Sequence, residues 1–487
     1  MKVLVVTGRL ARSEVIKAVR DAHIDGIEVG VLDVDVAAFI NSKKLISYLK
    51  ERENLDFDMI LVSGLITSDF SEVEEKFSIP VRLGPKHAYD LRYVLPLLGE
   101  VELSKEIPAC VLLAEHMRKR ALDDVSSYER DAVPSFTLRN VKIGGNSRMK
   151  VLAEVVDADK LDSHELCEKV RYFVENGADM IDLGISFDAD ENDVKRCVKH
   201  VRKVVGCPVS VDTLSPELIL AGVEAGCDLV LSINNNVMDE LEEFEESIAY
   251  VVVPDNGHGI MENLEKARSM GAKKLIADPL LEIKGSKGLV KSIQDYIEFR
   301  IRDKKTPLFF GVGNVVELFD ADSVGMNAVL SAIGYELGVS ILFTPEYSPK
   351  TRGSVRELWL SSCMMVLSKI RNTPPKDLGI DLLVLKEKRR RPSLPSSCGC
   401  VEGVERDIWR RDPKGSYTIN ISDDGYIIAR HTDGWCVRGR SAKEVYDTIL
   451  ERDGISSIEH ALYLGKELAR AELALKLGRS YAQDDIF

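Results

Sequence analysis

The sequence predicts an α/β protein whose centre is a closed (β/α)8 TIM barrel, with an N-terminal α/β open-sheet domain and a small C-terminal α+β domain. Three observations support this fold class. Between residues 148 and 372, short apolar runs alternate eight times with helical patterns. Residues 1–147 repeat the alternation on a smaller scale, and residues 411–487 combine a hairpin pattern with two helices. Residues 373–410 are expected to form a linker.

The first domain is expected to be an open parallel sheet. Its apolar runs predict strands, and one helical pattern covers Ser13–Ala22; the expected strands are Lys2–Thr7, Ile27–Leu32, Met59–Val62 and Cys110–Leu113. Thr7-Gly8-Arg9 and Ser63-Gly64 follow two of these strands, where such sheets bind ligands. Because the segment has neither a Gly-x-Gly-x-x-Gly motif nor a Walker lysine, the sequence favours a scaffold or partner-docking domain over a nucleotide site.

The second domain gives eight strand-then-helix units. The expected strands are Lys150–Val156, Met180–Leu183, Val209–Val211, Leu229–Ile233, Ala249–Val253, Lys274–Ala277, Leu308–Gly311 and Ser340–Phe343. The helices expected after them are Ser163–Asn176, Glu191–Val205, Pro216–Ala225, Met238–Glu246, Ile260–Met270, Leu289–Arg302, Ser323–Leu337 and Arg352–Ile370. Eight such units in about 220 residues match a closed barrel.

The third region begins with a basic run, Lys386–Arg391, and a proline- and serine-rich stretch, Pro392–Ser397, which together predict a solvated linker. Two strands, Tyr417–Ile421 and Tyr426–His431, flank a Ser-Asp-Asp-Gly turn. Helical patterns follow at Ser441–Leu450 and Ser457–Leu477. This region is expected to be a small α+β domain.

Composition limits the function classes. The chain has 79 acidic and 65 basic residues and a formal charge of −14, which disfavours nucleic-acid binding. No apolar run approaches the roughly 18 residues needed to span a membrane. The N-terminus lacks signal-peptide features, and nine thinly spread cysteines predict a reducing cytoplasm without a disulfide framework. Cys398, Cys400 and Cys436 could bind a metal, although a fourth ligand is not evident.

Polar side chains lie at the carboxyl end of almost every expected barrel strand. They are Asp157, Asp182, Asp212, Ser232 with Asn234, Asp255 with Asn256, Asp278, Asn314 and Thr344. Any single one could simply cap the next helix, but eight strands converge on one rim. Carboxylates and amides there can pair with a flat heterocycle that carries several N–H groups. A pterin fits this set better than a sugar phosphate, which would call for glycine-rich loops and a helix N-terminus.

Three segments together carry a family resemblance. Residues Gly177–Gly184 (GADMIDLG) resemble the second-strand motif of dihydropteroate synthases and of the pterin-binding barrels of corrinoid-dependent methyltransferases. Residues Val209–Thr213 (VSVDT) resemble their third-strand motif, and Ala277-Asp278-Pro279 their sixth-strand Asp-Pro. The whole arrangement of three regions resembles the archaeal dihydropteroate synthase-related proteins, a family linked to making tetrahydromethanopterin.

The resemblance implies roles for individual residues. Asp212 and Asp278 match the acids that hold the pterin ring, and Asp182 matches an aspartate near the same pocket. Asn234 is the candidate for the fourth-strand asparagine, with Ser232 as the alternative. The remaining candidates follow later strands: Arg352 resembles the arginine that meets the pyrophosphate or second substrate, and Lys284 or Lys287 could contact an anion or be a solvated loop lysine.

The seventh strand departs from the synthase pattern. True synthases have Ser-Arg-Lys there, whereas this chain reads Gly311-Val312-Gly313-Asn314-Val315. The segment resembles the methyltransferase branch, where an asparagine reaches the reactive nitrogen of the pterin. The histidine of the C-terminal Arg-x-His motif is also absent from Arg352-Gly353-Ser354.

The resemblance therefore implies a transferase that joins a dihydropterin methyl pyrophosphate to an arylamine, with Mg²⁺ accompanying the pyrophosphate. In that pathway the arylamine is a ribofuranosylaminobenzene phosphate, and a homodimer is expected. Methyl transfer to a corrinoid or another partner, and non-catalytic pterin binding, stay open as alternatives.

Overall fold

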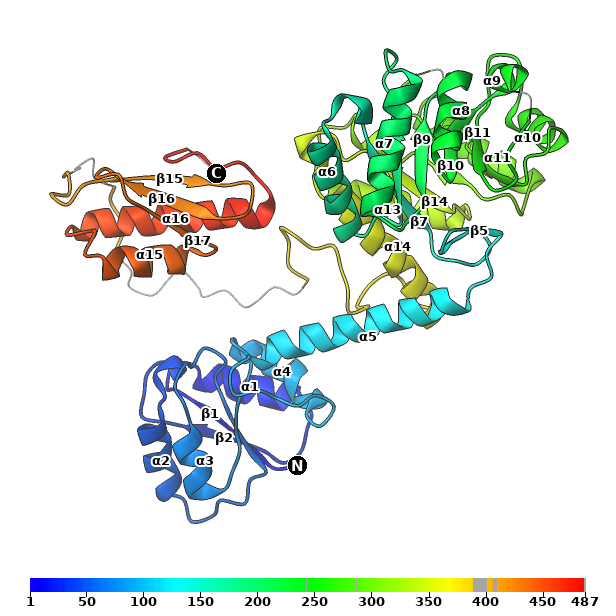
Figure 1. Ribbon diagram of the computed structural model, residues 1–487. Helices are drawn as coiled ribbons and strands as arrows, with labels where there is room; N and C mark the ends of the chain where they lie inside the picture. The colour runs from blue at the N-terminus through cyan, green and yellow to red at the C-terminus, as the bar shows by residue number, and fades with distance from the viewer. Residues whose placement is uncertain (242, 286, 389–400, 406–409, 486–487) are drawn as a thin grey trace. The chain divides into compact units, whose positions relative to one another are not determined.

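The computed structural model describes the chain except residues 242, 286, 389–400, 406–409 and 486–487 (Figure 1). The described residues form two compact units, Met1–Leu382 and Leu383–Phe487. The first unit contains a four-stranded and an eight-stranded parallel sheet and a two-stranded hairpin, and the second contains a three-stranded antiparallel sheet. The predicted fold class is confirmed. No helix among the described residues is long and apolar enough to cross a membrane.

The N-terminal sheet has the strand order β2-β1-β3-β4, with all neighbours parallel. Its strands are β1 (Val3–Thr7), β2 (Ile27–Val31), β3 (Met59–Val62) and β4 (Val81–Leu83). Its helices are α1 (Arg12–Asp21), α2 (Ser42–Lys50), α3 (Ser71–Phe77), α4 (Leu91–Val94) and α5 (Ala109–Asp131).

The prediction of one strand in this domain is wrong. Cys110–Leu113 lies in the first turn of α5, which is 23 residues long. A four-residue apolar run has no periodicity of its own, so it fits a strand and the buried side of a helix equally well. The fourth strand of the sheet is instead β4, which the sequence analysis did not identify.

Eight parallel strands form the barrel, at the upper right of Figure 1. They are β7 (Lys150–Val155), β8 (Met180–Gly184), β9 (Val209–Asp212), β10 (Leu229–Ile233), β11 (Ala249–Val252), β12 (Lys274–Ala277), β13 (Phe309–Phe310) and β14 (Ile341–Thr344). The ladder runs from β12 through β7 to β13, and a parallel bridge between Ala277 and Leu308 joins its two ends. The sheet is therefore closed.

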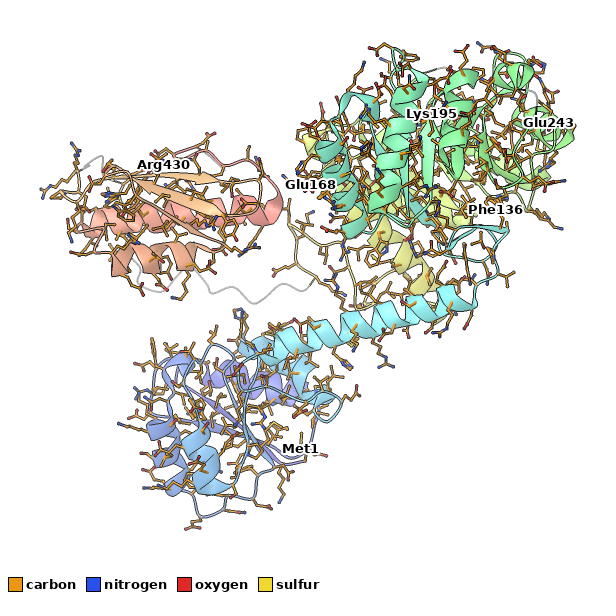
Figure 2. The ribbon with its side chains drawn as sticks, in the orientation of Figure 1. Met1, Phe136, Glu168, Lys195, Glu243 and Arg430 are labelled. Carbon is orange, nitrogen blue, oxygen red and sulfur yellow. The ribbon has the colours of Figure 1, made fainter. Side chains whose placement is uncertain are left out.

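Helices surround these strands. They are α6 (Ser163–Glu175), α7 (Glu191–Val204), α8 (Pro216–Ala225), α9 (Asn235–Glu240), α10 (Ile260–Ser269), α11 (Leu289–Arg302), α12 (Gly313–Val316), α13 (Ser323–Glu336) and α14 (Ser354–Arg371). Charged side chains such as Glu168 and Lys195 project from this outer layer (Figure 2). The fourth helix was expected at Met238–Glu246, but it starts earlier because the Asn234 side chain caps it, accepting a hydrogen bond from the Val237 N–H (3.0 Å).

Alternation along each strand separates two apolar layers. In β7, Val151 and Ala153 pack outward among the helices, whereas Leu152 packs inward with Met180 and Phe309. The inner layer also contains residues of a hairpin formed by β5 (Phe136–Leu138) and β6 (Val141–Ile143). Successive side chains of a strand point to opposite faces, so the residues two positions after the inner layer also point into the barrel.

The second unit packs two helices against a small sheet (Figure 1). Its elements are β15 (Tyr417–Ile421), β16 (Ile427–His431), β17 (Cys436–Gly439), α15 (Ala442–Glu451) and α16 (Ile458–Leu477). The third strand, β17, was not predicted. Residues 389–400 and 406–409 of the predicted linker lie outside the described residues. Cys398 and Cys400 are among them, so the possible cysteine metal site stays a hypothesis.

Candidate functional site

Three carboxylates gather inside the carboxyl end of the barrel. Glu154 lies two residues after Leu152 in β7, and it is in register with Asp182 of β8. Asp212, the last residue of β9, is in register with Gly184 of β8. One carboxylate oxygen from each of the three acids lies within 4.8 Å of the other two. Strand alternation and register thus concentrate negative charge at one point of the interior.

Asp182 is the most buried member of this acidic cluster, with 0% of its surface exposed. Its Oδ1 accepts a hydrogen bond from the Ser210 hydroxyl, whereas its Oδ2 has no partner among the described residues. Burial, followed by the charges of Asp212 and Glu154, raises the pKa of Asp182 well above its usual value. An unpartnered buried carboxyl oxygen is costly, so it indicates a group adapted to a proton, a cation or a ligand donor.

The two half-buried members of the cluster titrate near neutral pH. Burial and then the charge of Asp212 raise the pKa of Glu154 to about 8. Burial and then the charge of Asp278 raise the pKa of Asp212 to about 7. Groups with pKa values this close to the working pH are common at functional sites.

Asp278 follows β12 and is only 4% exposed. Burial raises its pKa to about 6, opposed by hydrogen bonds that its Oδ1 accepts from the Tyr296 hydroxyl (2.7 Å) and the Leu280 N–H (2.9 Å). Tyr296 is a residue of α11 and is itself fully buried. Because its hydroxyl is held in place by packing, it fixes the orientation of the Asp278 carboxylate. Of the acids predicted for the site, the structure brings Asp182, Asp212 and Asp278 together.

Glu154 is a site residue that the sequence analysis missed. It is the last residue but one of β7, whereas this strand was expected to continue to Val156, so Asp157 was taken as the candidate at its end. The available signal was a lone acid in an otherwise apolar run. Gly184 makes room for it, because a Cβ on this glycine would lie 2.5 Å from the Glu154 Oε1.

The other predicted residues lie around this cluster in different environments. The Asn234 Oδ1 accepts the hydrogen bond that caps α9, and exposed Asn314 donates through Nδ2 to the Leu281 carbonyl (3.3 Å). Arg352 is exposed and interacts with Tyr172, whose hydroxyl donates to Glu346 (2.6 Å).

The two candidate loop lysines differ. Lys284 is exposed, and no ion pair or hydrogen bond joins it to the described residues. Lys287 forms an ion pair with Asp295 (2.8 Å) and donates to the Pro279 carbonyl (3.3 Å), and its charge lowers the pKa of Asp278. Lys287 is thus tied to the loop that carries Asp278.

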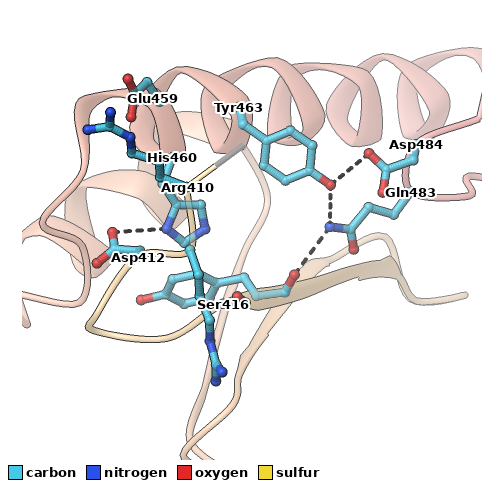
Figure 3. A pocket seen from close by; sticks show the side chains of 10 residues that line it. Arg410, Asp412, Ser416, Glu459, His460, Tyr463, Gln483 and Asp484 are labelled. Atoms are coloured by element: carbon cyan, nitrogen blue, oxygen red, sulfur yellow. Dashed lines mark hydrogen bonds and ion pairs between the residues drawn. The ribbon is translucent and has the colours of Figure 1, made fainter. Parts of the chain in front are cut away.

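A cavity of about 680 Å³ lies in the second unit, which the sequence analysis did not anticipate (Figure 3). Its centre is buried Asp412, which accepts hydrogen bonds from the N–H groups of Lys414, Ser456 and Ser457 and lies 3.1 Å from the Nδ1 of His460. Burial alone would raise the pKa of Asp412, but hydrogen bonds from the Ser456 hydroxyl and from the N–H groups of Ser456, Lys414 and Ser457 hold it well below its usual value.

On the other side of this cavity, the Gln483 amide donates to the Tyr463 hydroxyl (2.8 Å) and to the Tyr417 carbonyl (3.2 Å). The same tyrosine hydroxyl donates to Asp484 (2.8 Å). The polar groups at the centre of the cavity are thus paired with each other, which is typical of a stabilising network.

Comparison with known proteins gives two family matches. Residues 154–273 match the family described as pterin binding enzyme, and residues 411–484 match the family described as PterinBD-DUF4346. The first match begins at Glu154 and contains Asp182 and Asp212.

A full-length relative is the uncharacterized protein MJ0107 of Methanocaldococcus jannaschii. It is 36% identical over 523 aligned positions, which cover 100% of this chain and 99% of that protein. A Ycf91-like protein of a Nostoc species is 45% identical over 49 residues, or 9% of this chain and 39% of that protein.

Among solved structures, the chain is similar to dihydropteroate synthases. The Yersinia pestis enzyme with a pterine-sulfa conjugate has 16% identity and a TM-score of 0.38, and the match covers 48% of this chain and 99% of that one. The Xanthomonas albilineans enzyme with 4-aminobenzoic acid has 18% identity and a TM-score of 0.36, with 47% and 95% covered.

Proposed function

Because the chain belongs to the family of the Methanocaldococcus jannaschii protein MJ0107, and because its barrel contains a segment that matches pterin binding enzymes, we propose that the protein is a pterin-binding transferase of the dihydropteroate synthase type. The observation that carries the proposal is the acidic cluster of Glu154, Asp182 and Asp212, with Asp278 close to it.

In this proposal Asp212 and Asp278 bind the aminopyrimidine edge of the pterin. That edge presents a pair of N–H donors, and a carboxylate accepts two parallel hydrogen bonds from such a pair. Burial strengthens these bonds, because water competes little at a site where Asp278 is 4% exposed. Asn234 and Asn314 supply further amide groups at the rim, and Arg352 with Lys284 supplies positive charge for an anionic substituent.

The proposed reaction joins a 7,8-dihydropterin-6-methyl pyrophosphate to an arylamine. The C–O bond between the methyl carbon and the pyrophosphate breaks, and its electron pair leaves with the pyrophosphate. A C–N bond forms to the amine, and the amine proton passes to water. The protein positions the two substrates and stabilises the separating charges. We further propose a ribofuranosylaminobenzene phosphate as the amine, a role in tetrahydromethanopterin biosynthesis, and a homodimer, which sedimentation would detect.

The residues present also fit the Mg²⁺ expected with a pyrophosphate. Mg²⁺ prefers oxygen ligands and usually binds through one or two carboxylates plus phosphate oxygens. Glu154 and Asp182 offer such oxygens, and the Oδ2 of Asp182 has no partner among the described residues. When bound there, the ion would neutralise charge on the leaving pyrophosphate.

The test is release of pyrophosphate from a dihydropterin methyl pyrophosphate in the presence of the arylamine. The wild-type protein is expected to release it, and Asp212→Asn is expected to release it at least tenfold more slowly. Glu265→Gln, which changes an exposed acid on the outer helix α10, is the matched control and should behave as wild type. Equal rates for Asp212→Asn and the control would remove the acidic cluster from the reaction.

Methyl transfer is a second candidate because of one residue, Asn314. It replaces the synthase lysine after the seventh strand. It is exposed, and among the described residues its side chain makes one long hydrogen bond, from Nδ2 to the Leu281 carbonyl. In a methyltransferase this amide would hydrogen bond to N5 of a methylated pterin. Transfer of the methyl group to a corrinoid acceptor, without pyrophosphate release in the first assay, would establish this function. Tight pterin binding with neither activity would indicate a non-catalytic module.

A further inference from the structure

The N-terminal sheet changes winding direction at its centre. In the order β2-β1-β3-β4, the chain moves from β1 to β2 on one side and then returns past β1 to β3 and β4 on the other. Helices α1 and α4 cover one face, where Val15 and Leu91 pack on Val5, and helices α2 and α3 cover the opposite face. In such sheets the loops after the two central strands diverge, and ligands bind in the crevice between them.

A cavity of about 210 Å³ lies at this point of divergence. Its walls are mostly aliphatic and come from the ends of the two central strands, including Val6, Leu61 and Val62. Its polar lining is small: Thr7 at the end of β1, Ser63 after β3, Lys86 after β4, and Asp35 after β2. A mainly apolar cavity with a few convergent polar groups is the usual form of a small-molecule site.

Thr7 is the decisive residue of this lining. It is 3% exposed, and no hydrogen bond joins its hydroxyl to any residue that the structure describes. The hydroxyl is not among the fully buried, unpartnered polar atoms of the described residues, so it opens onto the cavity. A threonine hydroxyl that opens onto a cavity without a protein partner can donate a hydrogen bond to a ligand or accept one from it.

Positive charge is available at the same edge. Lys86 is exposed, and within the described part of the chain it has no ion pair. Gly64 lets the backbone of this loop pack closely, since a Cβ there would lie 2.9 Å from the Lys86 backbone nitrogen and 2.5 Å from the Gly84 carbonyl oxygen. Asp35 is the one acidic residue of the lining, and Arg9 neutralises it through an ion pair (3.1 Å).

The start of α1 adds a favourable dipole. This ten-residue helix begins after Leu10 and Ala11, both of which line the cavity, and no side chain in the described part of the chain caps its N-terminus. The free N–H groups of a first helical turn attract anions. Hydroxyl, ammonium and helix N-terminus therefore favour a negative group at the rim, with a flat apolar body between the aliphatic walls.

We propose that this cavity, lined by Thr7, Ser63 and Lys86 at the switch point between β1 and β3, is a second ligand site that binds a phosphorylated metabolite with a flat ring, of about mononucleotide size. The site does not depend on the pterin proposal, because the acidic cluster of the barrel contributes no residue to it.

Calorimetric titration of the full-length protein with adenosine 5′-monophosphate, adenosine and inorganic phosphate tests the proposal. The monophosphate is expected to bind at least about tenfold more tightly than either of the other probes. Lys86→Ala and Thr7→Val are each expected to weaken it by about tenfold, which corresponds to one lost hydrogen bond or ion pair of moderate strength. Lys43→Ala, which changes an exposed lysine on α2, is the matched control and should bind as wild type.

Three outcomes would overturn the proposal. The first is no saturable binding of the monophosphate or of phosphate at millimolar concentration. The second is equal binding of adenosine and the monophosphate, which would remove the anion site, or of phosphate and the monophosphate, which would remove the ring site. The third is unchanged affinity in both variants with thermal unfolding like that of wild type. Loss of binding in Lys86→Ala should leave pyrophosphate release unchanged, which separates this site from the barrel.

Discussion

Asp212 is the single residue on which pterin recognition depends most directly. It is half-buried, faces the barrel interior and lies close to Asp278. Asp212→Asn removes one carboxylate acceptor, which is expected to cost about 1.5–3 kcal/mol of binding free energy. Equilibrium titration with a dihydropterin should therefore show affinity lowered by roughly 10- to 150-fold. Glu265→Gln should leave the affinity unchanged, and an equal loss in both variants would contradict a specific role for Asp212.

The pKa values of the same residues predict how pterin affinity depends on pH. In the free protein Asp278 and Asp212 have pKa values of about 6 and about 7, so both are partly protonated near neutrality. A ligand that donates N–H groups favours the ionised carboxylates, so binding lowers these pKa values and releases protons. Affinity should rise between pH 6 and pH 8, and calorimetry in buffers of different ionisation enthalpy should detect proton release. Affinity that falls over this range would contradict the assignment.

Asp182 is expected to lower the free energy of unfolding at high pH. Its pKa is raised in the folded protein, so the folded state binds more protons than the unfolded state at pH values above the usual range of an aspartate. The free energy of unfolding therefore falls as the pH rises from about 4 towards 8. Asp182→Asn removes this loss and should stabilise the protein by about 1–3 kcal/mol at pH 8 and by less at pH 5. Thermal unfolding at the two pH values measures the difference, and a larger gain at pH 5 would contradict it.

Whether a site residue could be identified from the sequence depended on whether it belongs to a local motif. Asp212 ends a strand, Asp182 lies within one, and both belong to recognisable motifs, so the sequence identified them. Glu154 could not be assigned because its role depends on register with β8, which is a long-range property. Which acids have raised pKa values depends on their burial, and burial is set by the closed barrel rather than by any local pattern.

At the scale of elements, the neighbouring strands β7 and β8 fit together through a glycine of one and an acidic side chain of the other. Gly184 in β8 leaves space for the Glu154 carboxylate of β7, with 2.5 Å between the place of a Cβ and Oε1. Gly184→Ala must displace this carboxylate or the strand, which is expected to cost about 1–3 kcal/mol of stability.

A double-mutant cycle tests this contact. Glu154→Ala should relieve most of the cost of Gly184→Ala, so the two changes should be strongly non-additive in urea unfolding. Gly206→Ala is a suitable control because no atom lies within 4 Å of its added Cβ. Additive effects of Gly184→Ala and Glu154→Ala would show that the two residues do not compete for the same space.

Most elements were predictable because their period or their caps are local. Helix α8 begins at Pro216 after Ser215, whose hydroxyl accepts from the Leu218 N–H. It ends at Ala225, just before Gly226 with its positive φ, so the sequence alone identifies both ends. The strand wrongly expected at Cys110–Leu113 had no such signals. Its helical state depends on 23 residues of α5 acting together.

At the scale of the whole molecule, the count of eight strand–helix units predicted that the barrel closes. It did not predict the seam, the place where the first and last strands of the ladder meet. The seam is the bridge between Ala277 and Leu308, where β13 contributes two residues instead of the four expected. The interior is also filled from a distance, by the hairpin of β5 and β6 that precedes the barrel in sequence. Such contacts depend on the complete fold, so no local pattern predicts them.

The division into two units predicts that pterin binding is a property of the first alone. All four acids of the proposed site lie before Leu382, and the core of the second unit is built from residues 417–481 only. A chain that ends at Leu382 should therefore fold and bind a dihydropterin with an affinity within about twofold of the full-length protein, because no hydrophobic core is cut. Titration of both proteins, with circular dichroism to check folding, measures this. A folded first unit that no longer binds would instead show that residues 383–487 complete the pterin site.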